Sequence, residues 1–188
     1  MQSLYLWDYQ YLSIIQQLNA LEKFSEVREL GLLLLKNNKT SFLLMQTLAN
    51  IYLNHGDWVN AKKYCSEAYK SGPGHPGIVR MMDSLDIDKN SLVRPVTLST
   101  KDFEQLTGVY TNDWNGNEIT ISYSRDTIFF LSPDGRFQLI PFAKNKAYFI
   151  NSATTVEFNI DVETDGKASY FLLHLGDGEL LKCTRKDV

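Results

Sequence analysis

Two different patterns of apolar residues divide the chain. Up to about residue 90, apolar residues recur at spacings of three and four, which is typical of helices that bury one face. From about residue 100, apolar and polar residues alternate between Asn-Gly and Asp-Gly pairs, which is typical of strands joined by tight turns. The polar stretch between the two patterns ends at Pro95. The sequence therefore predicts an α+β protein of two separate domains, residues 1–90 and 101–188, with a linker over 91–100.

The clearest motif is a predicted helical hairpin between Phe42 and Pro73. Apolar positions fall on one face of a first helix, Gly56 can close that helix in the left-handed conformation, and a second apolar face follows up to Pro73. The small side chains of Ala49 and Ala61 allow the two helices to approach closely. This hairpin resembles the tetratricopeptide repeat, a helix–turn–helix unit of 34 residues. The matching positions are Leu48, Ala49, Tyr52, Gly56, Ala61, Ala68 and Pro73.

A weaker copy of the hairpin lies one 34-residue period earlier. Glu22 stands where the second hairpin has its turn glycine, and Lys39 stands where it has its terminal proline. After Pro73, the apolar spacing over 78–85 predicts one further helix that caps the array. The apolar positions that the copy shares with the clear hairpin are Ile14, Ile15, Leu18, Phe24, Val27 and Leu34.

Repeats of this family usually bind a peptide or another domain along the face formed by their first helices. In the clear hairpin this face carries Leu43, Gln46, Asn50 and Asn54. The resemblance places Asn50 where peptide-binding members often hold a backbone or carboxylate group. A clamp for a terminal carboxylate also needs basic residues, and Gln46 stands where a lysine would be expected. The face is therefore a candidate for a peptide partner of unspecified sequence, or for packing against another domain.

The carboxyl-terminal half predicts eight strands joined by short turns. Turn residues occur at Asn115-Gly116, at 132–135, at Asp165-Gly166 and at 176–178, so consecutive strands should pair antiparallel. Eight such strands in under 90 residues favour closure into a barrel, because an open sheet leaves two bare edges. The expected strands cover residues 106–112, 117–124, 127–132, 136–141, 147–150, 154–162, 168–175 and 179–185.

Two pairs of adjacent aromatic residues, Phe129-Phe130 and Tyr170-Phe171, lie within these strands. Neighbouring side chains of a strand point to opposite faces, so one member of each pair should lie outside the barrel core. We expect the outward ring either to pack against the helical repeats or to mark a partner surface.

The same half resembles a known module. The run over 103–110, Phe-Glu-Gln-Leu-Thr-Gly-Val-Tyr, is similar to the start of the lipocalin-like domain found carboxy-terminal to beta-lactamase-related serine hydrolases. In that family the catalytic serine lies in a separate upstream domain, and helical repeats sometimes stand between the two. The resemblance therefore implies a lipocalin-like barrel and a serine hydrolase domain as a partner or neighbour. Further matching positions are Ile119, Ile121, Phe137, Leu139, Pro141, Phe149, Val156, Phe158, Asp165, Gly166, Lys167 and Arg185.

The chemistry of such a hydrolase is missing from the sequence. Its Ser-x-x-Lys motif places a lysine one helical turn from the serine nucleophile, and this chain has no such spacing. The segment Tyr110-Thr111-Asn112 fits the family's middle tyrosine motif only superficially, because no serine accompanies it. The three histidines, His55, His75 and His174, lack metal-ligand spacing. We therefore expect no catalytic, cofactor-binding or metal-binding residues, and hence a protein that is not an enzyme.

Charge and composition limit the partners. Residues 1–95 hold 10 basic and 9 acidic side chains, and residues 96–188 hold 9 and 13, so the net charge of −3 comes from the second half. This balance argues against nucleic-acid binding. No apolar stretch is long enough to predict a membrane span, and Cys65 and Cys183 are expected to be buried and unpaired. The compartment stays open: cytoplasmic from this chain alone, periplasmic if it is the tail of an exported hydrolase.

These observations favour a non-catalytic interaction or accessory module that contacts a protein or peptide through its helical repeats. The alternative is a small-ligand carrier that uses the barrel interior, although short-stranded barrels of eight are usually filled by their own side chains. An independent hydrolase is disfavoured because no nucleophile and base can be named.

Overall fold

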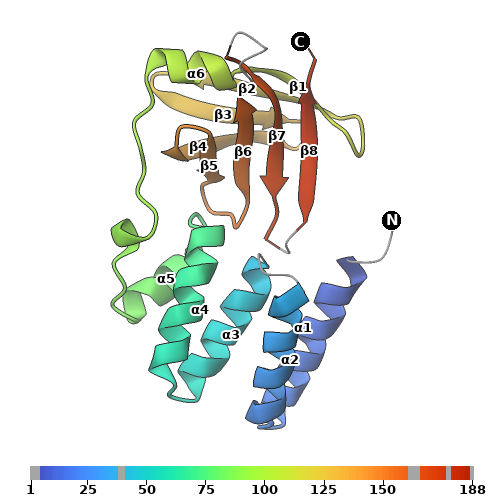
Figure 1. The fold of residues 1–188 in the computed structure, drawn as a ribbon, viewed down its shortest axis with the longest axis vertical. Coiled ribbons are helices and arrows are strands. Elements are labelled where there is room, and N and C mark those ends of the chain that lie inside the picture. Colours follow the sequence, from blue (N-terminus) through green and yellow to red (C-terminus); the bar gives the residue numbers. More distant parts are fainter. Residues whose placement is uncertain (1–4, 38–40, 161–165, 177–178, 187–188) are drawn as a thin grey trace. The chain divides into compact units, whose positions relative to one another are not determined.

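The computed structural model of the chain describes residues 5–37, 41–160, 166–176 and 179–186 (Figure 1). Within these residues six α-helices precede a closed antiparallel barrel of eight strands, which confirms the predicted α+β architecture. The chain divides into two compact units. The first comprises Met1–Leu92 with Gly176–Glu179, and the second comprises Val93–Leu175 with Leu180–Val188.

Five helices of the first unit follow the 34-residue period. They are α1 (Tyr5–Ala20), α2 (Phe24–Asn37), α3 (Phe42–Asn54), α4 (Trp58–Ser71) and α5 (Pro76–Ser84). The last residues of α1 and α3 are 34 positions apart, as are both ends of α2 and α4 and the first residues of α3 and α5. The two hairpins and the further helix expected from the sequence are therefore present, and α5 stands where a third hairpin would begin.

The turns inside the two hairpins have the same conformation. Glu22 has φ 58° and Gly56 has φ 76°, both in the left-handed region. The Glu22 N–H donates to the carbonyl of Asn19 at 3.0 Å, and the Gly56 N–H donates to that of Leu53 at 3.1 Å. Glycine adopts this conformation without strain, whereas a residue with a β-carbon does not. The departure of Glu22 from the repeat pattern therefore changes the energy of the turn and leaves its geometry intact.

The second hairpin has a capped start at each helix. The side chain of Ser41 accepts a hydrogen bond from the Leu44 N–H at 3.3 Å, and that of Asp57 accepts one from the Asn60 N–H at 3.1 Å. Such caps satisfy N–H groups that the first turn of a helix leaves unpaired. The Asp57 carboxylate also accepts from the side chain of Asn60, and these hydrogen bonds lower its pKa.

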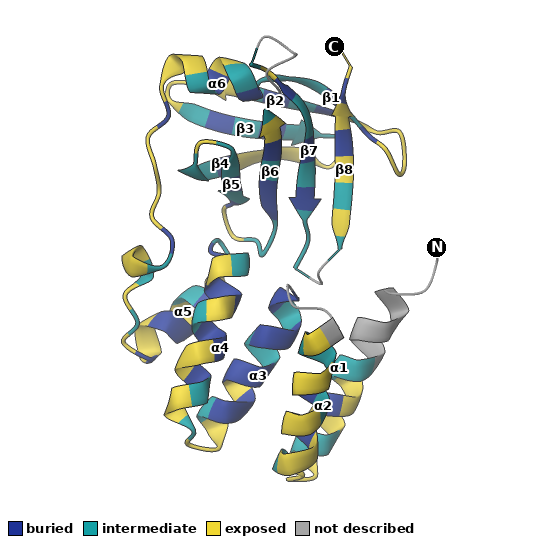
Figure 2. Cartoon of the chain, in the orientation of Figure 1, coloured by how far each residue is buried: buried dark blue, intermediate teal, exposed yellow. Residues whose placement is uncertain are grey.

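Burial in the first unit concentrates on α3, whereas much of α2 is exposed (Figure 2). One core cluster joins Ile15, Val27, Leu44 and Ile51 from the first three helices. Gly31 of α2 allows the closest approach to α3, because a β-carbon built there would lie 2.5 Å from a methyl carbon of Leu48. The side chain of Leu48 thus occupies the space that a larger residue in α2 would fill.

The second unit is a meander in which each strand pairs with the next and the last pairs with the first. This confirms the expected closed barrel, and residues 161–162 of the sixth expected strand lie outside the described residues. The turns expected at Asp165-Gly166 and 176–178 lie partly outside them as well. The strands are β1 (Gly108–Asn112), β2 (Glu118–Ser124), β3 (Thr127–Ser132), β4 (Gly135–Ala143), β5 (Lys146–Phe149), β6 (Thr155–Ile160), β7 (Ala168–His174) and β8 (Leu180–Arg185).

A short helix, α6 (Thr100–Leu106), precedes the barrel where the sequence analysis expected the end of a linker and the start of a strand. Ser99 and Asp102 form a reciprocal capping box that starts it. Phe103 and Leu106 are buried in the barrel core cluster. Seven residues are too few to show a helical period, but the Ser-x-x-Asp spacing was a usable signal. A 3₁₀ turn, η1 (Lys89–Ser91), ends at the first residue of the expected linker.

Aromatic rings run in contact through the barrel interior. The ring centroid of Phe171 lies 4.8 Å from that of Tyr110, 5.6 Å from that of Phe158 and 6.1 Å from that of Phe130. Phe130 in turn lies 5.0 Å from Phe149. These rings are all buried and belong to one core cluster. The interior is therefore packed with the barrel's own side chains across several strands.

Arg185 joins both ends of the barrel sequence. Its guanidinium donates to the carbonyl of Ala168 at 3.0 Å, to that of Thr107 and to the hydroxyl of Tyr110 at 3.4 Å. Among the described residues it is the only charged side chain in the buried class, with 8% of its surface exposed. A buried guanidinium is tolerated when its donors are satisfied, so these hydrogen bonds hold β8 to the start of β1.

Each outward-facing ring of the adjacent aromatic pairs lies under a cation of the neighbouring strand. Phe130 and Phe171 are the buried members, as the alternation requires. The guanidinium of Arg136 lies 3.7 Å from the centroid of Phe129, and the Lys182 ammonium lies 4.6 Å from that of Tyr170. Both cations sit two positions from the directly paired residue, which is the diagonal contact of antiparallel strands. Each outward ring is therefore in contact with a cation of the same barrel, an arrangement that was not among the two expected from the sequence.

Candidate functional site

The four residues singled out in the sequence share one side of α3. Leu43, Gln46, Asn50 and Asn54 are spaced by three and four positions, so their side chains fall along one stripe of the helix. Leu43 and Gln46 are half-buried, whereas Asn50 and Asn54 are exposed. We call this stripe the amide face. The other sides of α3 are buried through Phe42, Leu44, Met45, Leu48, Ala49, Ile51 and Tyr52.

The amide face continues onto the start of α5. A β-carbon built on Gly77 would lie 2.9 Å from the side-chain nitrogen of Gln46, so the two residues are in contact. The rings of Phe42 and His75 lie 4.8 Å apart at the same place. The absence of a side chain at Gly77 therefore leaves room for the Gln46 amide between the two helices.

The 34-residue period places polar residues in a row across the three first helices. Gln16 of α1, Asn50 of α3 and Ser84 of α5 are equivalent positions, and all three are exposed. The Ser84 hydroxyl donates to the carbonyl of Met81 at 2.9 Å. The 34-residue period is enough to identify the equivalents on α1 and α5 once Asn50 is chosen on α3.

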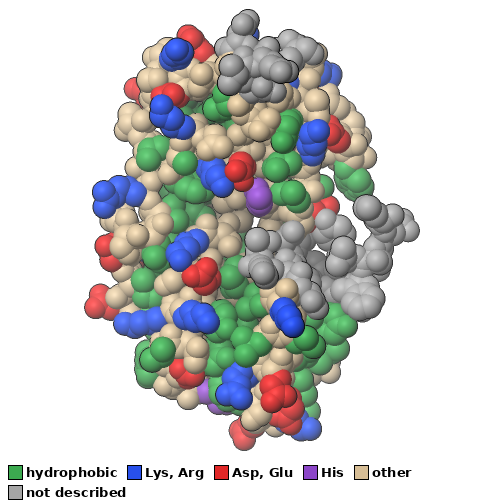
Figure 3. Space-filling view, viewed as in Figure 1, with side chains coloured by type: hydrophobic (Ala, Val, Ile, Leu, Met, Phe, Trp, Pro, Cys, Tyr) green, Lys and Arg blue, Asp and Glu red, His purple; other side chains and the backbone are tan. Residues whose placement is uncertain are grey.

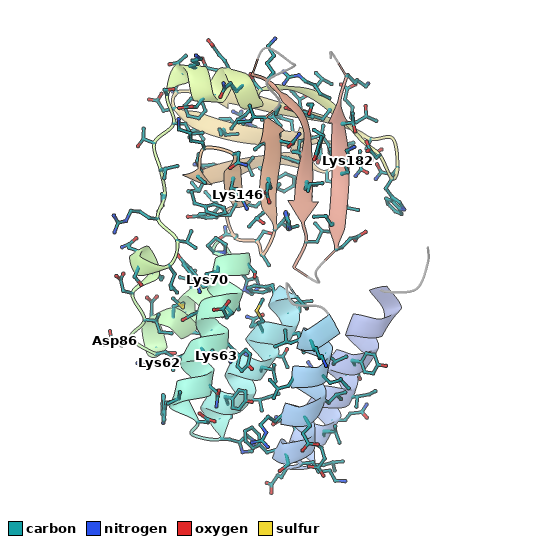
Figure 4. All side chains as sticks on the ribbon, viewed as in Figure 1. Lys62, Lys63, Lys70, Asp86, Lys146 and Lys182 are labelled. Atoms are coloured by element: carbon teal, nitrogen blue, oxygen red, sulfur yellow. The ribbon has the colours of Figure 1, made fainter. Side chains whose placement is uncertain are left out.

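The amide face differs in charge from the second helix of the same hairpin. Lys62, Lys63 and Lys70 are exposed along α4 (Figure 4), and the Lys70 ammonium lies 3.0 Å from the carboxylate of Glu67. The four residues of the amide face carry no charge. On the face drawn in Figure 3, positive and negative side chains are interspersed. The amide face is therefore suited to hydrogen bonds and apolar contacts with a partner rather than to attraction by net charge.

Each of the three histidines makes a ring or charge contact of its own. His55 stacks on Phe24 at 4.2 Å, and Nε2 of His174 lies 3.4 Å from the carboxylate of Glu157. Burial lowers the pKa of His75, and the charge of Arg80 lowers it further. Among the described residues no group of three His, Cys, Asp or Glu side chains has the arrangement of a metal site.

Both cysteines are buried and unpaired, as expected. Burial raises the pKa of the Cys65 thiol to about 12, and burial together with the charge of Asp113 does the same for Cys183. The thiolate is the reactive form of cysteine, so these side chains act as small apolar core residues at neutral pH.

No family model matches the chain, and no curated protein matches its sequence. In the part of the chain that the structure describes, no helix has the length and apolar character needed to traverse a lipid bilayer.

Proposed function

We propose that this chain is a non-catalytic interaction module whose helices are tetratricopeptide-like repeats. Its partner is a protein or peptide segment that lies along the amide face, in contact with Leu43, Gln46, Asn50 and Asn54. The support comes from the 34-residue period in the helix boundaries and from the repeated turn conformation, both of which fit this family of helical hairpins.

One observation carries the proposal. The accessible side of α3 presents three neutral amides next to one half-buried leucine, while the rest of its circumference is buried. A side-chain amide has donors and an acceptor, so it can pair with the N–H and C=O groups of an extended peptide. Leu43 adds an apolar contact at one end of the row. Asn50 and Asn54 are the exposed amides of the row, so they are the two most open to a partner.

We propose that the barrel has an accessory role like that of the lipocalin-like tail of beta-lactamase-related serine hydrolases. Its partner is then a hydrolase domain. The supporting features are the run over 103–110, which forms α6 and enters β1, and the closing residue Arg185. The chain itself has no Ser-x-x-Lys spacing, so the hydrolytic serine would belong to that other domain. The packing of rings through the barrel interior favours this role over that of a small-ligand carrier.

Selection from a random peptide display library tests the amide face. We expect enriched peptides whose affinity falls about tenfold or more in the Asn50→Ala, Asn54→Ala double variant, because each lost amide leaves polar groups of the peptide unpaired. The matched control is Lys62→Ala with Lys63→Ala on α4, which should change affinity less than about twofold. Equal losses in both variants, or no enrichment at all, would contradict the proposal. Hydrolysis of an ester or β-lactam by the pure chain would contradict its non-catalytic part.

A further inference from the structure

One side of α1 is an apolar stripe that is open to solvent. Ile14 and Leu18 lie on one side of α1, and Leu21, in the turn directly after its last residue Ala20, continues this side because its N–H still donates to the carbonyl of Gln17 at 3.1 Å. The exposed fraction is 42% for Ile14 and 68% for Leu21, and Leu18 is half-buried. We call these three residues the α1 stripe. The exposed amide of Gln16 lies on a different side of the helix, so the stripe is separate from the amide row.

The 34-residue period shows what such a stripe contacts in the second hairpin. The equivalents of the three residues are Leu48 and Tyr52 of α3, which are only 0% and 3% exposed, and His55, which caps the end of α3. Gly31 of α2 lies against Leu48, where a β-carbon would meet a methyl carbon at 2.5 Å. Phe24 of α2 packs edge-on against Tyr52 at 5.6 Å and stacks on His55 at 4.2 Å. The equivalent stripe of α3 is thus covered by an antiparallel helix with an aromatic residue and, seven positions later, a glycine.

The next period retains the small residue of this arrangement in a buried position. Trp58 and Cys65 of α4 are the equivalents of Phe24 and Gly31, and Cys65 is fully buried. Met82 of α5 lies 34 residues after Leu48 and is fully buried as well. Trp58, however, is 56% exposed, so the full arrangement is found at the α2–α3 junction, where an aromatic residue and a small residue seven positions later cover the stripe of the next first helix.

We propose that the α1 stripe binds an amphipathic helix of the same type, antiparallel to α1, with an aromatic residue at one position and Gly, Ala or Cys seven positions later. The small residue faces Ile14, and the aromatic ring faces Leu18 and Leu21. This helix belongs to another polypeptide segment rather than to a second copy of α2 or α4, because Gly31 and Cys65 of those helices are already buried at the internal junctions. The stripe extends the established stacking interface by one unit.

This site is independent of the amide face, so the failure of either leaves the other standing. It differs from the amide face in chemistry, because its three residues are aliphatic and it recognises a helix rather than an extended peptide.

The probe is a synthetic peptide with the sequence of residues 23–36, which contains Phe24 and Gly31. A hydrocarbon staple between the positions of Ser25 and Glu29, both exposed in α2, keeps it helical, since free peptides of this length are marginal helices. We expect saturable binding of the labelled peptide to the full chain by fluorescence anisotropy. Binding should weaken about tenfold or more with Leu21→Glu or Ile14→Glu, and likewise when the peptide carries Gly31→Leu.

The matched control is Leu33→Glu in the full chain, because Leu33 is 58% exposed but lies outside the stripe, and it should change affinity less than about twofold. Circular dichroism checks that each variant keeps its helices. No saturable binding, or equal weakening by Leu33→Glu and Leu21→Glu, would overturn the proposal. A concentration-dependent dimer in light scattering that Ile14→Glu abolishes would also overturn it, because the stripe would then bind a second copy.

Discussion

The barrel and the helical unit differ in how completely their elements are covered by neighbours. Every strand of the barrel has a hydrogen-bonded neighbour on each side, because β8 pairs with β1. The helical hairpins instead stack in a row, and α1 at the start of that row keeps an apolar stripe exposed at Ile14 and Leu21. A closed sheet leaves no edge for another strand, whereas a stack of hairpins leaves a face for another helix. The exposed helical surface is therefore the place to test for a partner.

The two units also differ in the range of the contacts that hold them. The guanidinium of Arg185 bonds to Tyr110, which lies 75 positions earlier in the chain. In the helical unit, the first hairpin packs against the second through Gly31 and Leu48, and the helix boundaries recur at a period of 34 residues. The barrel core should therefore respond to a substitution as a whole, and the helical unit should respond locally.

The largest effect should come from the centre of the barrel. Phe171 is fully buried against rings from three other strands, so Phe171→Ala should lower the free energy of unfolding by about 3–5 kcal/mol. Tyr170→Ala is the matched control, because its ring lies outside the core under Lys182, and it should cost about 1 kcal/mol or less. Urea unfolding measures both. Similar losses would break the distinction between the inner and outer face of the barrel.

Closure of the barrel is tested at Arg185. Replacing it with methionine removes donors from the carbonyls of Thr107 and Ala168, and we expect a loss of about 2–4 kcal/mol, since each unpaired buried acceptor costs ~1–3 kcal/mol. Lys186→Met is the control. Its ammonium lies 2.6 Å from Glu118 but is half-exposed, so the loss should stay within about 0.5 kcal/mol. If amide hydrogen exchange in β1 and β8 were unchanged in Arg185→Met, closure would not depend on this residue.

The stacking of the hairpins is tested at Gly31. Gly31→Val introduces atoms into the space of Leu48 and should cost about 1–3 kcal/mol. Combined with Leu48→Ala, the loss should be smaller than the sum of the two single losses by at least about 0.5 kcal/mol, because the smaller side chain makes room. Thermal unfolding followed at 222 nm measures the cycle. Additive losses would show that Gly31 and Leu48 do not share one space.

The smallest effect concerns the turns of the two hairpins. Glu22→Gly should raise stability by about 1 kcal/mol, because it relieves a left-handed residue with a β-carbon. Gly56→Glu should lower stability by a similar amount, since no neighbouring atom within 4 Å blocks the new side chain and only the backbone is strained. The same urea measurements compare them. Shifts of the same sign in both variants would show that the two turns are not equivalent.

Local patterns predicted most of the elements. The helical period located both hairpins and α5, and the alternation of apolar residues located all eight strands to within about three residues where the structure describes them. The helix α6 was missed because seven residues contain too few turns for a period to appear. The cations over Phe129 and Tyr170 were missed because they belong to neighbouring strands, so their register had to be known first.

The sequence predicted the part of the candidate site that lies within one helix, and it missed the part that depends on a contact between helices. The spacing of Leu43, Gln46, Asn50 and Asn54 follows from the helix period alone, and the structure places all four on the accessible side of α3. The contact of Gln46 with Gly77 joins α3 and α5, which have the whole of α4 between them in the sequence, so no local pattern reports it.

The helices, strands and turns follow from the pattern of the sequence because they depend on neighbours within one or two turns of the chain, and the 34-residue unit follows from the recurrence of that pattern. Which apolar residues are covered depends instead on how the helices stack. Leu48 and Ile14 occupy the same position of their helices, yet Leu48 is fully buried against α2 and Ile14 is 42% exposed. Burial depends on what lies opposite a side chain in space, and that is a property of the stack rather than of the repeat.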